Sequence, residues 1–163
     1  MKNFTKPDYL KSEYNKINNL FLSGKFDKVI EKSKKIIEKN PTQIPFYNFL
    51  ALSYREKGKI FLAEKILLNA LKISPNNQSV LINLGSTYRV LIEFDKSEKF
   101  LKKAIQLMPN DPIVNDHYGD VLWKLNRKIQ AKYYWQSALN SKESEEEMKK
   151  NISKKLLKGL IES

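Results

Sequence analysis

Apolar residues recur along most of the chain at intervals of three and four, the spacing of amphipathic helices. The pattern is clearest between Ile44 and Asn77, where two such helices flank a turn at Lys57-Gly58-Lys59 and the second stops at Pro75. The apolar faces are Tyr47, Leu50, Ala51 and Tyr54 in the first helix, and Ala63, Leu67, Ala70 and Leu71 in the second. This stretch therefore predicts two helices joined by a tight turn.

The helix pair recurs along the chain at a constant interval. The same spacing separates Pro41, Pro75 and Pro109; Ala70, Ala104 and Ala138; Gly24 and Gly58; Tyr54 and Tyr88; Leu50 and Leu84; and Gly85 and Gly119. Because several residue types share the period, the chain contains an internal repeat. We predict a lead at residues 1–9, four repeats at 10–43, 44–77, 78–111 and 112–143, and a final helix at 144–163.

This period of about 34 residues, with Leu-Gly, Tyr, Ala and Pro at fixed offsets, resembles the tetratricopeptide repeat (TPR). The resemblance runs from Leu10 to about Glu145. It implies an all-α fold, a right-handed α-solenoid of four helix-turn-helix repeats followed by a C-terminal capping helix. The segment from Asp116 to Leu139 also resembles the last repeat of many proteobacterial TPR proteins, which indicates a bacterial source.

Two repeats lack glycine at the turn. Asn126 replaces it in the fourth repeat and tolerates the left-handed conformation, whereas Ile92 replaces it in the third. A β-branched residue is costly at positive φ, so we expect another turn geometry there, with Ile92 packed under the turn beside Phe94. On that interpretation Ile92→Gly destabilises the protein. Asn76 or Asn77, and Asp111 ahead of Pro112, are placed to cap the helices that follow them.

The final helix is predicted to cover the end of the fourth repeat. Ser144 and Glu147 have the spacing of a capping box. The apolar stripe comprises Met148, Ile152, Leu156, Leu157, Leu160 and Ile161, and the side chains expected to face water are Lys149, Lys150, Lys154 and Lys155. Removal of residues 144–163 is expected to expose the fourth repeat.

Composition excludes some classes of function. The chain has 163 residues and no cysteine, which rules out disulfides, thiolate zinc sites and cysteine nucleophiles. Neither a signal peptide nor a long apolar run is present, so we expect a cytoplasmic protein without a membrane span. We also expect a monomer that unfolds cooperatively, because each repeat needs its neighbours to bury a face.

The net charge is +12, from 30 Lys and Arg against 18 Asp and Glu. Such an excess is typical of proteins that bind nucleic acid or anionic surfaces, but it also arises from lysines on solvated helix faces. Only Arg55, Arg89 and Arg127 are arginines, the residue that base-edge and bidentate phosphate recognition favours. The pattern therefore favours solvated lysines over a nucleic-acid site.

The TPR resemblance implies a concave groove lined by the first of the two helices in each repeat, which we call the first helix. The residues that line it are the second, fifth, sixth, ninth, twelfth and thirteenth of each first helix. Such a groove suits a polypeptide, because amides can hold its backbone and aromatics supply contact area. Arg55 and Arg89 share the twelfth position and favour an acidic ligand, extended or helical. Carried over by register, the candidate site is Asn48, Phe49, Leu52, Arg55, Asn83, Ser86, Arg89, Asp116, His117, Asp120 and Trp123.

Two known TPR grooves share only part of this pattern. Adaptors that bind the Glu-Glu-Val-Asp tails of heat-shock chaperones use cationic side chains at fixed repeat positions. This chain lacks them whether its first or its second repeat is aligned with the start of that groove, so the role is disfavoured. The repeats of O-linked N-acetylglucosamine transferase carry an asparagine ladder at the sixth residue. That row reads Asn15, Phe49, Asn83 and His117 here, a half-kept ladder.

Asp116, His117 and Asp120 have a spacing that could seed a metal site. One helix supplies too few ligands, and Asp120 has Lys124 four positions on as an ordinary ion-pair partner. We therefore expect no metal and no cofactor. Because no phosphate loop, nucleophile elbow or kinase motif is present, we expect a protein that is not an enzyme.

The leading hypothesis is a non-catalytic adaptor that binds one polypeptide in the groove. A second hypothesis is a TPR segment accessory to a glycosyltransferase or sulfotransferase, since such repeats often precede those catalytic domains. A third is binding of RNA or an anionic surface through the lysines, which moderate salt would abolish.

Overall fold

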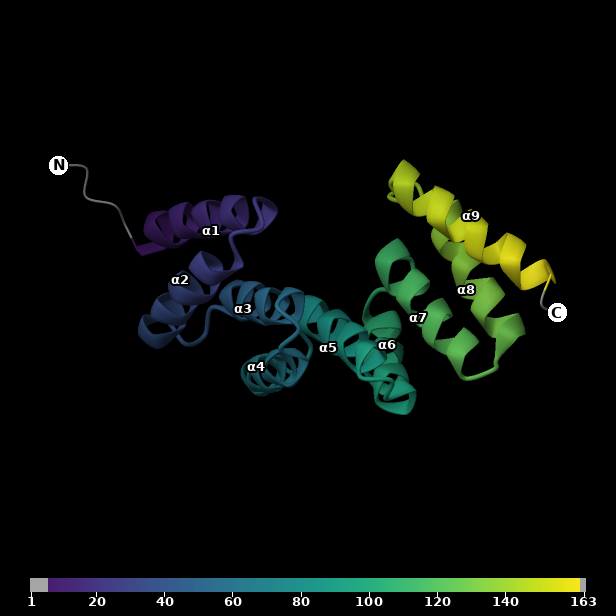
Figure 1. Ribbon diagram of the computed structural model, residues 1–163, viewed down its shortest axis with the longest axis horizontal. Coiled ribbons are helices and arrows are strands. Elements are labelled where there is room, and N and C mark those ends of the chain that lie inside the picture. The colour runs from purple at the N-terminus through teal and green to yellow at the C-terminus, as the bar shows by residue number, and fades with distance from the viewer. Residues whose placement is uncertain (1–5, 162–163) are drawn as a thin grey trace. The chain divides into compact units, whose positions relative to one another are not determined.

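The computed structural model describes residues 6–161, and this part of the chain is folded into nine α-helices and no strand (Figure 1). The odd-numbered helices are α1 (Lys6–Leu22), α3 (Ile44–Glu56), α5 (Gln78–Val90), α7 (Pro112–Lys124) and α9 (Glu146–Ile161). The even-numbered helices are α2 (Phe26–Lys39), α4 (Ile60–Ile73), α6 (Phe94–Leu107) and α8 (Lys128–Asn140). The prediction of an all-α helical-repeat fold is confirmed.

The helix starts reproduce the sequence period. From α3 onward the odd helices begin at Ile44, Gln78, Pro112 and Glu146, and the even helices begin at Phe26, Ile60, Phe94 and Lys128, always one repeat length apart. Two compact units share these helices: unit 1 is Met1–Pro75 and holds α1 to α4, and unit 2 is Asn76–Ser163 and holds α5 to α9.

All four turns within the helix pairs have one geometry. Gly24, Gly58, Ile92 and Asn126 have φ of 68°, 71°, 62° and 60°. In each turn the residue that follows the positive-φ residue donates its N–H to the carbonyl five positions back. Lys59 donates to Tyr54 at 2.8 Å, and Glu93 donates to Tyr88 at 2.9 Å. This is the Schellman arrangement, which satisfies carbonyls at the helix end and requires a left-handed residue.

Ile92 therefore contradicts the prediction made for it. It takes the same left-handed conformation as the glycines, and its side chain is 73% exposed rather than packed under the turn. The turn hydrogen bonds and the packing of α5 against α6 impose the geometry, and the β-branched side chain bears the strain.

Helix starts and repeat junctions use local hydrogen bonds. Asn77 accepts from the N–H of Val80 at 3.1 Å and Asp111 accepts from that of Val114 at 2.9 Å, which confirms both predicted caps. At two junctions a side chain of the following helix donates to the proline carbonyl. The hydroxyl of Tyr47 reaches Pro41 and the amide of Asn115 reaches Pro109, both at 2.9 Å.

Unit 1 contains a hydrophobic cluster with three aromatic rings in contact. The buried residues of this cluster are Ile17, Val29, Ile36, Phe46 and Phe49, with Leu10, Leu20, Phe21 and Ile37 packed around them. The ring of Phe49 lies between Tyr14 and Phe21, at centroid distances of 5.3 and 6.0 Å. This core joins α1, α2 and α3 and includes one residue that was predicted to bind ligand.

Unit 2 packs its helix pairs through glycines. A Cβ built on Gly85 would lie 2.4 Å from Cγ of Leu101, and one built on Gly119 would lie 2.5 Å from the ring of Trp135. The hydroxyl of Ser97 also donates to the carbonyl of Gly85 at 2.6 Å. These contacts leave no room for a side chain, so the glycine that recurs at this position of the repeat serves close helix packing.

The two ends differ in detail from the prediction. Helix α1 begins at Lys6, with Pro7 in its first turn, so the lead is helical from residue 6 and residues 1–5 lie outside the described part. Helix α9 begins at Glu146, and the Ser144 hydroxyl donates to the carbonyl of Ala138, so Ser144 closes α8 instead of heading a capping box for α9.

Ile152 of α9 is fully buried against Trp135 and Ala138. The expected apolar stripe is correct for Met148, Ile152 and Leu156, whereas Leu157 is 62% exposed. The side chains of Leu160 and Ile161 lie outside the described residues. Within the described part of the chain, no helix is long and apolar enough to cross a membrane.

The strained turn generates a stability prediction. Ile92→Gly removes an exposed side chain from a left-handed residue, so it should raise the free energy of unfolding by about 1 kcal/mol, measured by urea denaturation.

Gly58→Ala is the matched control, because no atom lies within 4 Å of a Cβ built there and only the φ of 71° opposes it. It should lower stability by a similar amount. A loss of stability in Ile92→Gly would contradict the strain assignment.

Candidate functional site

The predicted site residues of unit 1 lie on α3. Asn48, Leu52 and Arg55 are half-buried, whereas Phe49 is only 8% exposed and belongs to the core. The interpretation of Phe49 as an exposed groove aromatic is therefore wrong, because Tyr14 and Phe21 cover its ring. The convergence of Asn48 with residues of unit 2 stays a prediction.

Unit 2 holds the other predicted residues on α5 and α7, which pack against each other. On α5, Asn83 and Arg89 are half-buried and Ser86 is buried. On α7, Asp116, His117, Asp120 and Trp123 are all half-buried. Of these residues, the structure brings Arg89, Asp116, His117, Asp120 and Trp123 close together.

The acids of α7 form an ion-pair network with neighbouring helices. Nζ of Lys155, on α9, lies 2.7 Å from a carboxylate oxygen of Asp116 and 2.7 Å from one of Asp120. Arg89 pairs with the second oxygen of Asp120, and Nε1 of Trp135 donates to Asp120 at 3.1 Å. One carboxylate thereby joins α5, α7, α8 and α9.

Two sequence interpretations fail at this network. Lys155 was expected to face water, but its side chain turns inward to the two aspartates. Asp120 was expected to pair with Lys124, but it binds Arg89 and Lys155 instead. A partly desolvated carboxylate is stabilised more by two close cations and an indole N–H than by an exposed lysine.

The network also shifts the titration of Asp116. Burial raises the pKa of the Asp116 carboxyl above its ordinary value, and the charge of Asp120 adds to this effect. Lys155 and Arg89 act in the opposite direction. Because the folded state binds the proton more tightly, this group favours folding as the pH falls through its pKa.

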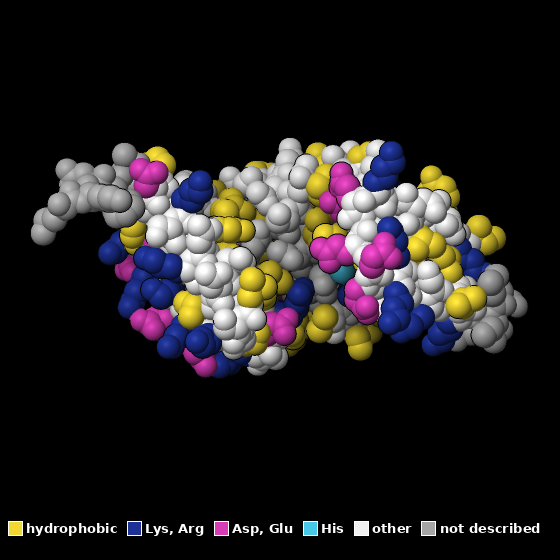
Figure 2. Space-filling view, turned by 90° about the horizontal axis from the view of Figure 1, so that it is seen from above, with side chains coloured by type: hydrophobic (Ala, Val, Ile, Leu, Met, Phe, Trp, Pro, Cys, Tyr) yellow, Lys and Arg dark blue, Asp and Glu magenta, His cyan; other side chains and the backbone are white. Residues whose placement is uncertain are grey.

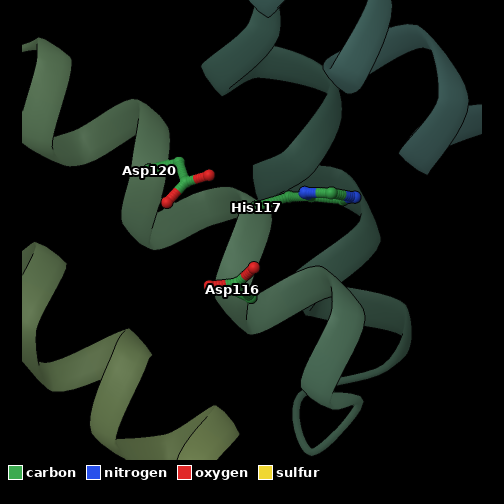
Figure 3. Close-up of side chains that lie close together, drawn as sticks. All are labelled: Asp116, His117 and Asp120. Atoms are coloured by element: carbon green, nitrogen blue, oxygen red, sulfur yellow. The ribbon is translucent and has the colours of Figure 1, made fainter. Parts of the chain in front are cut away.

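Asp116, His117 and Asp120 are the metal-ligand cluster found among the described residues, with one ligand atom of each within 4.8 Å of the others (Figure 3). Both carboxylates already bind cationic side chains. A metal ion would have to displace Lys155, so the cluster is better interpreted as a structural ion-pair network.

A second arginine is also paired within unit 2. Arg127 binds both carboxylate oxygens of Glu98, at 2.6 and 3.0 Å, and the hydroxyl of Tyr118 donates to the same carboxylate at 3.2 Å. Burial, together with Glu98, raises the pKa of Tyr118 to about 12. Arg89 and Arg127 thus hold helices together, and for Arg89 this weakens the argument that it selects an acidic ligand.

A small cleft lies beside the network and was not predicted. Its volume is about 190 Å³, and it is lined by Asp120, Trp123, Lys124, Trp135, Lys155 and Lys158. The two indole rings are 5.4 Å apart and inclined by 33°, and Nζ of Lys128 lies 5.3 Å from the centroid of Trp123. We call it the tryptophan cleft. The sequence pattern did not indicate it, because α9 was expected only to cap the fourth repeat.

A wider hollow of about 490 Å³ lies along α8. It is lined by Asn110, Tyr133, Gln136, Ser137, Asn140, Ser141 and Lys142. Most of these side chains are uncharged and polar, and Gln136 donates to Asn140 at 3.0 Å. No residue of the predicted site lines this hollow.

Residues 44–77 and 78–111 match the tetratricopeptide repeat family. A curated relative is the peroxisomal targeting signal receptor of Candida albicans, 30% identical over 115 residues. That match covers 68% of this chain but only 18% of the receptor, so the chain spans a small part of that protein. The two matched segments, with their period and turns, establish that the chain contains tetratricopeptide repeats.

Solved structures agree on the fold. A thermophilic TPR protein of Thermus thermophilus has a TM-score of 0.82 at 21% identity, covering 93% of this chain and 84% of that one. The first TPR domain of Spaghetti (RPAP3), bound to the HSP90 peptide SRMEEVD, has a TM-score of 0.66 at 19% identity, covering 71% of this chain and 91% of that one. At these identities the likeness shows the fold alone.

The network predicts a specific loss of stability. Lys155→Met removes the lysine that pairs with both Asp116 and Asp120, so the free energy of unfolding should fall by about 1–3 kcal/mol, between the values for exposed and buried ion pairs. Asp116→Asn in the same background should recover part of the loss. The deficit should also shrink as the pH is lowered from 7, because protonated Asp116 needs no cation.

Urea denaturation followed by circular dichroism measures both effects. Lys154→Met is the control, since Lys154 is exposed on the same helix and should change little. Equal effects of the two substitutions would show that the network does not stabilise unit 2.

Proposed function

We propose that this chain is a non-catalytic adaptor that binds a segment of another polypeptide on the faces of its first helices. The observation that supports this most directly is the face of unit 2 made by α5 and α7. There Val90 and Ile113 are exposed apolar residues, 50% and 45% accessible, on the same helices as half-exposed Asn83 and His117. Exposed apolar side chains beside polar ones are typical of protein-binding surfaces.

The chemistry of this face suits an extended chain. The Asn83 amide carries both donors and an acceptor, and the His117 imidazole can also pair with a peptide N–H or C=O. Val90 and Ile113 supply apolar contact at two positions of the repeat register. A polypeptide uses both kinds of contact at once, because its backbone is polar and its side chains alternate.

Similar proteins support polypeptide binding. The solved RPAP3 domain holds a peptide of HSP90, and the Candida albicans relative is named a receptor for a peroxisomal targeting signal. The chain lacks the cations that an acidic chaperone tail would need at the equivalent positions, so we propose the mode of binding and not either ligand.

The charged groups support an adaptor in place of an enzyme. Asp116 and Asp120 are neutralised by Lys155 and Arg89, which leaves these acids committed to helix packing. A general base must reach a substrate proton, and carboxylates held in this way are poorly placed for that role. A TPR segment accessory to a transferase would use the same binding face, so the identity of the partner distinguishes that hypothesis.

The lysine excess is the basis of one competing hypothesis, electrostatic binding of RNA or an anionic surface. On the face seen in Figure 2, lysine and arginine side chains are interspersed with acidic ones. Several lysines also pair with acids, such as Lys35 with Glu31 at 2.6 Å and Lys57 with Asp27 at 2.5 Å. Mixed charge of this kind favours solvation over a nucleic-acid site.

Site-specific photocrosslinking tests the proposal. A benzoylphenylalanine placed at Ile113 of the full chain should crosslink a polypeptide in extracts of the native organism, and mass spectrometry should identify the same partner from a probe at Val90. Ile129 is the control, because it is 87% exposed but lies on a second helix, α8.

The expected result is one shared partner for the two first-helix probes and none for Ile129. Crosslinking from Ile129 alone, or crosslinks to RNA in place of protein, would contradict the proposal. His117→Ala should also reduce the yield from Ile113 severalfold, while Lys102→Ala on α6 should leave it unchanged.

A further inference from the structure

Helix α9 occupies the place of another first helix. It begins one repeat length after α7, just as α7 begins one repeat length after α5. One side of α9 is buried through Ile152, and Leu156 packs against the same cluster. The positions equivalent to the first-helix face are all exposed, and they are Glu147, Lys150, Asn151, Lys154, Leu157 and Lys158. The binding face of unit 2 therefore continues from α7 onto α9.

The tryptophan cleft lies where α7 and α9 face each other. Trp123 and Trp135 form its apolar part, and Lys124 and Lys158 are exposed at its edge. Its volume of about 190 Å³ is below the roughly 300–1,000 Å³ of small-molecule sites, so one large side chain fits it better than a cofactor does.

The charge around the cleft is positive. Among the described residues that line it, the acidic one is Asp120, which is already bound by Arg89 and Lys155. Lys124 and Lys158 line the cleft, and Lys150 and Lys154 follow on the exposed side of α9. Lysines at a partly apolar site attract carboxylates and reject cationic partners.

The ring arrangement favours a side chain over a nucleobase. Trp135 is only 4% exposed, and its indole N–H is held by Asp120. Lys128 lies over the ring of Trp123, with Trp135 5.4 Å away. Base stacking needs an open aromatic face, whereas Trp135 exposes only a small part of its ring and Lys128 lies over that of Trp123.

We propose that the tryptophan cleft binds a large apolar side chain of a polypeptide whose flanking residues are acidic. This inference rests on the proposed function and specifies the chemistry of the partner. The apolar side chain contacts Trp123 and Trp135, and the acidic neighbours pair with Lys124 and Lys158. The acidic character assigned to the ligand thus depends on lysines of α7 and α9 and not on Arg89.

Tryptophan fluorescence provides a selective test, because the two tryptophans of the chain both line the cleft. The probe is an acetylated and amidated peptide with one phenylalanine between two pairs of glutamates. It should change the emission of the full chain saturably. Peptides with the glutamates replaced by glutamines, or the phenylalanine by alanine, should bind at least about tenfold more weakly.

Protein variants complete the test. The double substitution Lys124→Glu and Lys158→Glu should weaken binding of the acidic peptide by at least about tenfold. Lys102 is also exposed but lies on α6, so Lys102→Glu should leave this binding unchanged. Circular dichroism checks that each variant is folded. Binding of the glutamine peptide as tight as that of the acidic one, tighter binding of oligouridylate, or no saturable change would overturn the proposal.

The two proposals fail separately. If the acidic peptide does not bind but Ile113 still crosslinks a polypeptide, the adaptor function stands and the chemistry assigned to the cleft is wrong. If neither occurs, both are wrong.

Discussion

A left-handed residue at the end of each first helix, up to α7, is the constraint on which the repeat depends. The turn hydrogen bonds at Gly24, Gly58, Ile92 and Asn126 set the direction in which each second helix leaves. Because the helices have nearly equal lengths, the same turn keeps them in one constant register. Ile92 shows the strength of this constraint, since an unfavourable side chain adopts the conformation that the register demands.

The register gives α9 its place in unit 2. Ile152 packs where the repeat has an apolar residue, and Lys155 follows close enough to reach Asp116 and Asp120 on α7. The aspartates thus hold α9 in place through their ion pairs with Lys155. What remains accessible between the two helices is the tryptophan cleft and its exposed lysines.

The features predicted correctly from the sequence are local ones. The period and the caps at Asn77 and Asp111 depend on residues near one another or on equivalent positions of the repeat. The repeat alone also locates the face of α5 and α7. Such features follow from helix geometry and turn chemistry without knowledge of distant contacts.

The errors at Phe49 and Lys155 concern contacts between residues far apart in the chain, whereas those at Ile92 and Ser144 concern local turn geometry. Phe49 has the position of a groove residue, but Tyr14 and Phe21 of the first repeat pack against its ring. Lys155 follows a polar pattern along α9, yet its partners lie a full repeat earlier, on α7. Hydrophobic periodicity describes which side of a helix is apolar, and it carries no information on which charge meets which.

Hydrogen exchange of α9 tests most directly the central claim, that α9 is an integral part of unit 2 and occupies the place of a repeat's first helix. Mass spectrometry should find the backbone amides of Glu146–Ile161 protected to a level similar to those of α8, Lys128–Asn140. Protection of α9 should fall in Lys155→Met while that of α5 and α6 is retained. Rapid exchange throughout α9 in the unmodified chain, with α7 and α8 fully protected, would contradict the account.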